Sequence, residues 1–250
     1  MKAIIFAAGK GTRMGESSAH TPKPMRMLLD KTLMEHKLDI LPEQFDEVII
    51  VVGHLKEKIM DRFGNSYMRK AADGSESAER KPLKITYVIQ DEPLGTAHAL
   101  WCCKDALMRD GGGRFLVMMG DDIYDTESML ECASHDCSML LRHMDSIKGM
   151  AKIVFDENGC ITDILEKWQV DEPAFACAGM YSLTPEIFEC EMFQLPNGEF
   201  GLPQTIMTLS KNKGICVNAV KAKQWHSISS PEDIRAVEAI ISGEKTPEDA

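Results

Sequence analysis

The sequence alternates short apolar runs with stretches that have helical periodicity. The apolar runs predict buried strands at residues 2–7, 48–52, 85–89 and 115–119. The helical patterns between them lie at residues 33–41, 55–63 and 96–108. Strands that are apolar throughout favour a mostly parallel sheet covered by helices on both faces. The order therefore predicts an α/β fold, a Rossmann-like three-layer sandwich in which ligands bind at the carboxyl ends of the strands.

The pattern changes in the second half of the chain. Apolar runs at residues 151–155 and 161–165 flank a turn at 156–159, which is typical of a β-hairpin. The other predicted elements here are strands at residues 138–143 and 215–220 and helices at residues 202–211 and 231–242. Ser230, a preferred N-cap residue, and Asp233, three positions later, mark the start of the last helix. We expect the added hairpin to form the substrate side of the molecule.

The length of 250 residues is compatible with one large α/β domain or two small ones. A chain of this size buries roughly 70 to 75% of the surface that it exposes when unfolded, so a sizeable core is feasible. We predict a single domain at residues 1–243, with one part at 1–136 and a second at 137–243. The polar tail at 244–250 is expected to fray.

The charge balance restricts the partners of the protein. Lys and Arg number 28 against 39 Asp and Glu, which gives a formal net charge of −11. Such a chain does not attract DNA or an anionic membrane non-specifically, so we expect neither nucleic acid nor membrane as a partner. An anionic ligand must then be bound by a local basic site. The first apolar run is too short for a signal peptide, so we expect a cytoplasmic protein.

The eight cysteines show no Cys-x-x-Cys pair. Zinc ribbons and redox motifs need that close spacing to bring two thiolates together. With no secretion signal in the sequence, we expect the cysteines to be reduced and mostly buried.

A glycine-rich segment follows the first predicted strand. Gly9, Gly11 and Gly15 place backbone N–H groups at a strand end, where they are suited to bind phosphate. Their spacing matches neither the dinucleotide fingerprint nor the Walker A loop. Further on, Lys23 stands between Pro22 and Pro24, which restrict its backbone and hold the side chain on a rigid loop.

The pattern Gly-x-Gly-Thr-Arg at residues 9–13 and Pro-Lys-Pro at 22–24 resembles the sugar-1-phosphate nucleotidyltransferases, also called sugar-nucleotide pyrophosphorylases. The similarity is to enzymes of the glucose-1-phosphate uridylyl- and thymidylyltransferase kind. Further segments resemble that family in the same order, at residues 90–97, 120–121, 166–167, 178–181, 225 and 231–233. The resemblance thus extends over nearly the whole chain.

The resemblance implies a reaction between two polyanions. An oxygen of a hexose 1-phosphate attacks the α-phosphorus of a nucleoside triphosphate, which gives a nucleotide-sugar and pyrophosphate. The protein then acts mainly by positioning and charge neutralisation. It also implies that residues 1–136 bind the nucleotide and residues 137–243 the sugar phosphate. A homo-oligomer is compatible with it.

The resemblance assigns roles to particular residues. Arg13 would bind the departing pyrophosphate, Lys23 the α-phosphate and Lys167 the incoming sugar phosphate. Asp121 would bind Mg²⁺. The residues expected to bind the nucleotide are Ala8, Gly9, Gly11, Thr12, Gln90, Gly95 and Thr96. Those expected on the sugar side, besides Lys167, are Gly149, Glu166 and Gly179.

The base and the activity leave alternatives open. The Gln90 amide can pair with uracil or thymine, but guanine presents the same donor and acceptor order and a flipped amide suits an amino base. We favour UTP or dTTP on the resemblance alone. Ser227 stands where relatives often carry a second metal-binding Asp, and Cys177 where many carry Asn. One alternative is therefore a regulatory relative that binds nucleotide-sugar but is catalytically weak or silent. The others are a mannose-1-phosphate guanylyltransferase-like enzyme and an alditol-phosphate nucleotidyltransferase.

His98 follows the predicted base-binding segment. A phosphate nucleophile is already ionised at neutral pH and needs no base, so we expect no acid–base role for this histidine.

Overall fold

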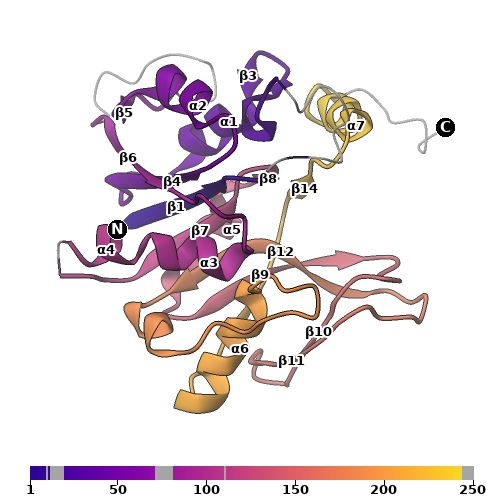
Figure 1. The fold of residues 1–250 in the computed structure, drawn as a ribbon. Helices are drawn as coiled ribbons and strands as arrows, with labels where there is room; N and C mark the ends of the chain where they lie inside the picture. Colours follow the sequence, from indigo (N-terminus) through magenta and orange to yellow (C-terminus); the bar gives the residue numbers. More distant parts are fainter. Residues whose placement is uncertain (10, 12–19, 71–80, 110, 244–250) are drawn as a thin grey trace.

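An eight-stranded sheet forms the centre of the protein, seen in a computed structural model that describes residues 1–9, 11, 20–70, 81–109 and 111–243 (Figure 1). The strand order is β13-β9-β12-β7-β1-β4-β6-β5. Parallel pairs join β7, β1, β4 and β6, and another joins β13 to β9. The strands are β1 (Lys2–Ala7), β4 (Glu47–Val52), β5 (Ser66–Tyr67), β6 (Leu83–Ile89), β7 (Phe115–Met119), β9 (Ser138–Met144), β12 (Ala174–Leu183) and β13 (Asn218–Lys221). The predicted, mostly parallel α/β sheet is confirmed.

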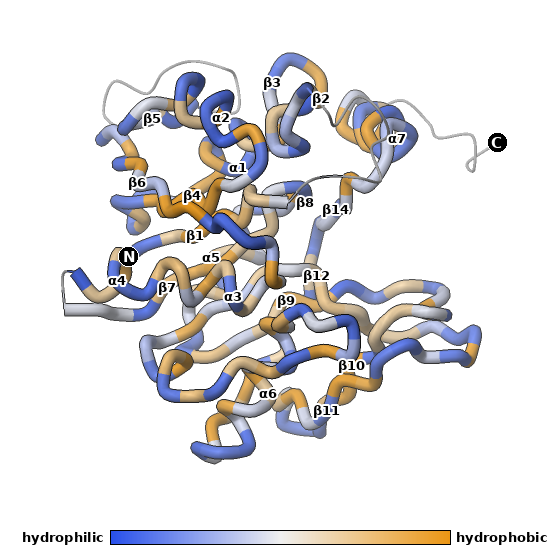
Figure 2. The backbone as a smooth tube through the Cα atoms, viewed as in Figure 1, coloured by the Kyte–Doolittle hydropathy of each residue, from blue (hydrophilic) through white to orange (hydrophobic). Residues whose placement is uncertain are grey.

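Helices cover both faces of this sheet. On one face lie α1 (Leu33–Ile40), α2 (Lys56–Phe63) and α5 (Thr126–Ser134), and on the other α3 (Thr96–Cys102), α4 (Lys104–Met108) and α6 (Leu202–Lys213). Successive residues of β1 point to opposite faces of the sheet. Ile5 packs in the core with α1 and α2, whereas Ile4 packs with α3 and α6. Hydrophobic residues are concentrated in the central strands (Figure 2). Burial on both faces explains why these strands are apolar throughout.

The remaining elements of the described residues are short strands, two 3-10 turns and a last helix. They are β2 (Met27–Leu28), β3 (Lys31–Thr32), β8 (Asp122–Tyr124), β10 (Lys152–Phe155), β11 (Ile161–Leu165), β14 (Trp225–Ser227), η2 (Lys23–Met25), η3 (Pro185–Glu189) and α7 (Pro231–Ile241). The antiparallel pair β10–β11 confirms the predicted hairpin. A capping box between Ser230 and Asp233 confirms the predicted start of α7. No helix among the described residues is both long enough and apolar enough to span a membrane.

Two predicted elements differ clearly from the structure, and some strands, β12 among them, were not predicted. The predicted helix at 96–108 is divided at Cys103 into α3 and α4, and the strand predicted at 215–220 begins only at Asn218. Strand β12 was not predicted, although it joins the two parts of the sheet by antiparallel pairs with β7 and β9. Its alanines and Gly179, which has a positive φ of 71°, weaken the local strand pattern.

The expectation that all cysteines are reduced is wrong for two of them. A disulfide joins Cys160 to Cys216 across 56 positions of sequence, and the other six cysteines are free. The fold brings the pair together because the backbone N–H of Ile161 donates to the carbonyl of Val217 at 2.8 Å and that of Ala219 to Gly159 at 2.8 Å. The disulfide therefore attaches the β10–β11 hairpin to the start of β13.

We expect reduction of this disulfide to destabilise the oxidised protein. A cross-link over a loop of this length restricts the unfolded chain and contributes about 2–4 kcal/mol to the free energy of unfolding. Thermal unfolding with and without a reductant would measure the effect. Cys160→Ser should unfold like the reduced protein under both conditions, whereas Cys102→Ser should keep the full response to the reductant. An identical midpoint for the wild-type protein in both conditions would contradict this account.

Candidate functional site

A cavity of about 390 Å³ opens where β1, β6 and β7 end. This is the edge of a parallel sheet at which ligands are expected to bind. Its walls come from both parts of the chain, namely residues 6–9 and 11, Lys23 and Pro24, Gln90, Pro93, Gly95, Thr96, Ala99, Met119, Gly120, Asp121, Leu195 and residues 199–201. A pocket of this size is sufficient for a small ligand.

An ion pair between Lys23 and Asp121 lies in the cavity wall. Lys23 Nζ donates to Asp121 Oδ2 at 2.5 Å, with the lysine side chain 10% exposed and the aspartate 32%. Lys23 begins the η2 turn, whose Pro24 is buried. The Gly120 N–H donates to the Phe6 carbonyl at 2.9 Å, and a Cβ on Gly120 would lie 2.4 Å from that oxygen. Glycine at position 120 therefore lets the Asp121 turn lie against the end of β1.

Two further charged groups are buried close to this pair. Asp122 is 5% exposed, and burial together with the charge of Asp121 raises its pKa to about 6. Lys37, on α1, is fully buried, and burial lowers its pKa to about 8 although the charges of Asp122 and Asp121 oppose the change. The pairing of β14 with β8 places Ser227 opposite Asp122. Lys37 thus supplies positive charge under the two carboxylates.

The amide of Gln90 is another polar feature of the cavity. Its Nε2 donates to the Gly95 carbonyl at 3.1 Å and lies 3.1 Å from His98 Nδ1. The loop of Gly95 is fixed by the backbone of Phe200, which donates to the Leu94 carbonyl at 2.7 Å and accepts from the Ala97 N–H at 2.9 Å. Gln90 is therefore held by the protein through its nitrogen, whereas the sequence suggested that both ends of the amide would contact a base.

The structure places the predicted residues in three groups. Those that line the cavity are Ala8, Gly9, Gly11, Lys23, Gln90, Gly95, Thr96 and Asp121. Thr12 and Arg13 lie outside the described residues. Those that do not line it are Gly149, Glu166, Lys167 and Gly179. The roles of all these residues stay predictions.

The residues predicted for the sugar side are spread over two places. The Gly149 N–H donates to the Trp168 carbonyl at 2.6 Å, which brings it beside the exposed Lys167. Glu166 accepts a hydrogen bond from Gln204 on α6. Gly179 lies under the acidic turn, since a Cβ there would be 3.1 Å from Asp122 Oδ2.

Sequence reasoning missed three contributors to the site. Lys37 belongs to a helix whose pattern gives no sign that a lysine is buried at that position. Glu199 and Phe200 line the cavity from the second part of the chain. The glycines on both sides, Gly198 and Gly201, mark this segment as irregular but do not indicate where it packs.

Comparison with known proteins decides the family. The family model described as nucleotidyl transferase matches residues 2–241. The chain belongs to this family. The chain is 28% identical over 257 residues to the "UTP--glucose-1-phosphate uridylyltransferase AglF" of Haloferax volcanii, with 98% of each chain covered.

Other relatives agree with this assignment. The chain is 30% identical over 246 residues to the "Bifunctional protein GlmU" of Methanococcus vannielii, and covers 53% of that protein, so it spans about half the length of the GlmU relatives that it matches. A solved UDP-glucose pyrophosphorylase in complex with UDP-glucose has the same fold, with a TM-score of 0.78, 24% identity, and 98% of this chain and 99% of that chain covered.

We expect Gly95→Ala to destabilise the protein. Gly95 has a φ of +102°, and a Cβ would lie 2.5 Å from the oxygen and 2.7 Å from the nitrogen of the Phe200 backbone. Strain and the displaced backbone together should lower the free energy of unfolding by about 3 kcal/mol. Chemical denaturation would measure the loss.

Gly214→Ala is the matched control. Gly214 also has a positive φ, +66°, but has nothing within 4 Å of the added Cβ. Its substitution should cost about 1 kcal/mol. Equal losses for the two variants would contradict the close packing of Phe200 on Gly95.

The buried lysine predicts a pH dependence of stability. Between pH 8 and about 10.5 the folded protein has released the Lys37 proton while the unfolded chain still holds it, so the free energy of unfolding should rise with pH in that window. The rise should be on the order of 3 kcal/mol. Denaturation at a series of pH values would show it as a difference from Lys37→Met. The exposed Lys211→Met should keep the wild-type profile, and parallel curves for wild type and Lys37→Met would contradict the burial of a titrating lysine.

Proposed function

We propose that the protein transfers a nucleotidyl group from a nucleoside triphosphate, with UTP or dTTP favoured, to a hexose 1-phosphate. The products are a nucleotide-sugar and pyrophosphate. Two similar proteins support this substrate class, one named as a UTP–glucose-1-phosphate uridylyltransferase and one solved with UDP-glucose. The observation that carries the proposal is that a single cavity is lined by the Lys23–Asp121 pair and by the Gln90–Gly95 segment.

The charged pair suits the chemistry of the phosphates. A triphosphate bound in the cavity would compete with Asp121 for the ammonium of Lys23, which would then neutralise charge on the α-phosphate. The bond from the sugar phosphate oxygen to the α-phosphorus forms as the bond to the leaving pyrophosphate breaks. The attacking oxygen is already ionised, so no side chain has to remove a proton. Lys23 therefore contributes by charge and position.

The residues present fit a magnesium ion. The Asp121 carboxylate is partly exposed in the cavity wall and is an oxygen ligand of the kind that Mg²⁺ prefers. Among the described residues, no group of three or more His, Cys, Asp or Glu side chains could enclose a metal. Asp121 would thus hold the ion together with phosphate oxygens and water, an arrangement that Mg²⁺ commonly adopts. When bound, the ion would supply charge neutralisation of the triphosphate.

The sugar phosphate is proposed to bind beyond the cavity, on the side of the β10–β11 hairpin. Lys167 and Glu166 follow β11 directly and are exposed. An ammonium suits a phosphate and a carboxylate suits sugar hydroxyls. The hydrogen bond from Gln204 gives Glu166 a support from α6.

An assay of pyrophosphate release tests the function. The protein is incubated with each of the common nucleoside triphosphates, a panel of hexose 1-phosphates and Mg²⁺. We expect release with at least one pair, and loss of release when EDTA removes the metal. No release with any pair, together with measurable nucleotide binding, would favour a silent regulatory relative, in line with Ser227 opposite Asp122.

Two variants test the residues in the cavity wall. Lys23→Ala and Asp121→Ala should each lower kcat/KM at least ~100-fold, because they remove charge at the reacting phosphates. Lys31→Ala is the control, since Lys31 pairs with Asp39 at 2.7 Å and does not line the cavity. Full activity of Asp121→Ala would overturn the metal assignment, and full activity of Lys23→Ala the phosphate assignment.

A further inference from the structure

We propose that His98 is a positioning residue that fixes the side-chain amide of Gln90 with its carbonyl oxygen toward the cavity, and thereby selects bases that carry a ring N–H. The inference rests on the proposed function in that it assumes the cavity receives a nucleotide base. It goes beyond the proposed function by naming the residue that orients the Gln90 amide and the class of bases that this amide accepts.

The orientation of the Gln90 amide follows from the atom that it faces. The Gly95 carbonyl can only accept a hydrogen bond, so the amide atom 3.1 Å from it must be the nitrogen. The alternative, flipped amide would place two carbonyl oxygens against each other. The Gly95 carbonyl itself is held in place because Phe200 packs on its loop.

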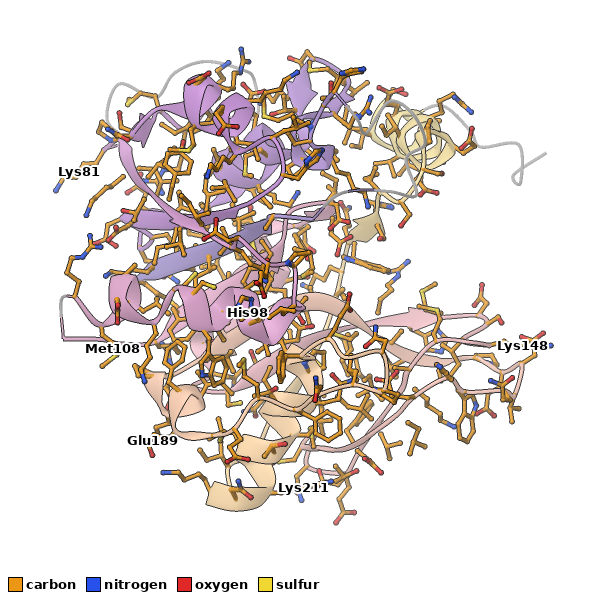
Figure 3. All side chains as sticks on the ribbon, viewed as in Figure 1. Lys81, His98, Met108, Lys148, Glu189 and Lys211 are labelled. Carbon is orange, nitrogen blue, oxygen red and sulfur yellow. A yellow bond between two sulfur atoms is a disulfide. The ribbon has the colours of Figure 1, made fainter. Side chains whose placement is uncertain are left out.

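His98 binds the second hydrogen of the same nitrogen. Its Nδ1 lies 3.1 Å from Gln90 Nε2, and since that nitrogen is a donor, Nδ1 must be the acceptor. The ring is then neutral, with its proton on Nε2, which lies 4.0 Å from Cys102 Sγ. His98 is partly buried and lies on α3, the helix that begins directly after Gly95 (Figure 3).

The arrangement leaves one atom of the amide for a ligand. Both hydrogens of Nε2 are used within the protein, and Oε1 has no hydrogen-bond partner among the residues that the structure describes. The residue is 7% exposed and lines the cavity. The cavity therefore meets a fixed acceptor at this position.

A fixed acceptor distinguishes bases by their ring nitrogen. Uracil and thymine offer N3–H and guanine offers N1–H, each of which can donate to Oε1. Cytosine N3 and adenine N1 carry a lone pair at the same place, so the two acceptors would repel and Gln90 Oε1 would have no donor once the base covers it. A site built to bind a donor discriminates strongly against a ligand that lacks it.

Binding measurements on His98 variants test the inference. Dissociation constants for UTP, dTTP, GTP, CTP and ATP are measured by calorimetry without sugar phosphate. The wild-type protein should bind UTP, dTTP or GTP more tightly than CTP and ATP. His98→Leu removes one of the two acceptors that hold Gln90 Nε2, so that only the Gly95 carbonyl still opposes rotation of the amide. Loss of this one hydrogen bond should reduce the preference for UTP over CTP about tenfold. His98→Phe repeats this test if the leucine variant does not fold.

Two further variants separate positioning from a general disturbance of α3. His98→Asn offers an amide oxygen close to the place of Nδ1 and should retain the preference. Cys102→Ser alters the neighbour on the other side of the ring and should also retain it. The inference is overturned if His98→Leu and His98→Phe keep the wild-type preference, or if the wild-type protein binds CTP or ATP as tightly as whichever of UTP, dTTP and GTP it binds best. Failure of the proposed function would differ, since nucleotides would bind with the stated preference but no pyrophosphate would be released.

Discussion

The ion pair between Lys23 and Asp121 is the contact on which the rest of the site depends. It joins side chains 98 positions apart: Asp121 follows β7, which pairs with β1 so that Phe6 lies opposite Met119, and Lys23 begins the η2 turn. The rigid Pro22-Lys23-Pro24 segment and the close approach of Gly120 to Phe6 leave little freedom to either partner. A substitution that displaces the η2 turn or the Gly120 turn would therefore separate the two charges, even where it touches neither.

The ion pair lies next to two buried charged groups that lower the stability of the protein. Asp122 and Lys37 are both buried. The pKa of Asp122 is raised to about 6, and that of Lys37 is lowered to about 8. Each change shows that burial disfavours the ionised form. The lysine reduces the repulsion between two adjacent carboxylates, so the acidic turn can be kept at the sheet edge at the expense of stability.

Much of the fold could be predicted from local sequence patterns. Part of the site could be predicted as well, because strands that end at one edge of a parallel sheet bring the residues that follow them together. Gln90 and Asp121 follow β6 and β7 in this way, but they and Lys23 could be named from the sequence because the family resemblance implied their roles. Strand β12, the Cys160–Cys216 disulfide and the packing of Phe200 on Gly95 depend on contacts between distant segments. Lys37 could not be found either, since an amphipathic pattern does not predict a buried lysine. The orientation of the Gln90 amide could not be predicted either, because it follows from the positions of the Gly95 carbonyl and His98 Nδ1 in the fold.

Charge and hydrogen bonding have different roles in this cavity. Lys23 and a metal at Asp121 would attract any nucleoside triphosphate, because all carry the same phosphates. Selection of the base must therefore come from a group without net charge whose donor or acceptor character is fixed. A free glutamine amide does not satisfy this condition, since it can turn and accept either pattern. The contacts of Gln90 with Gly95 and His98 remove that freedom, which gives a neutral histidine a role in a reaction that needs no base.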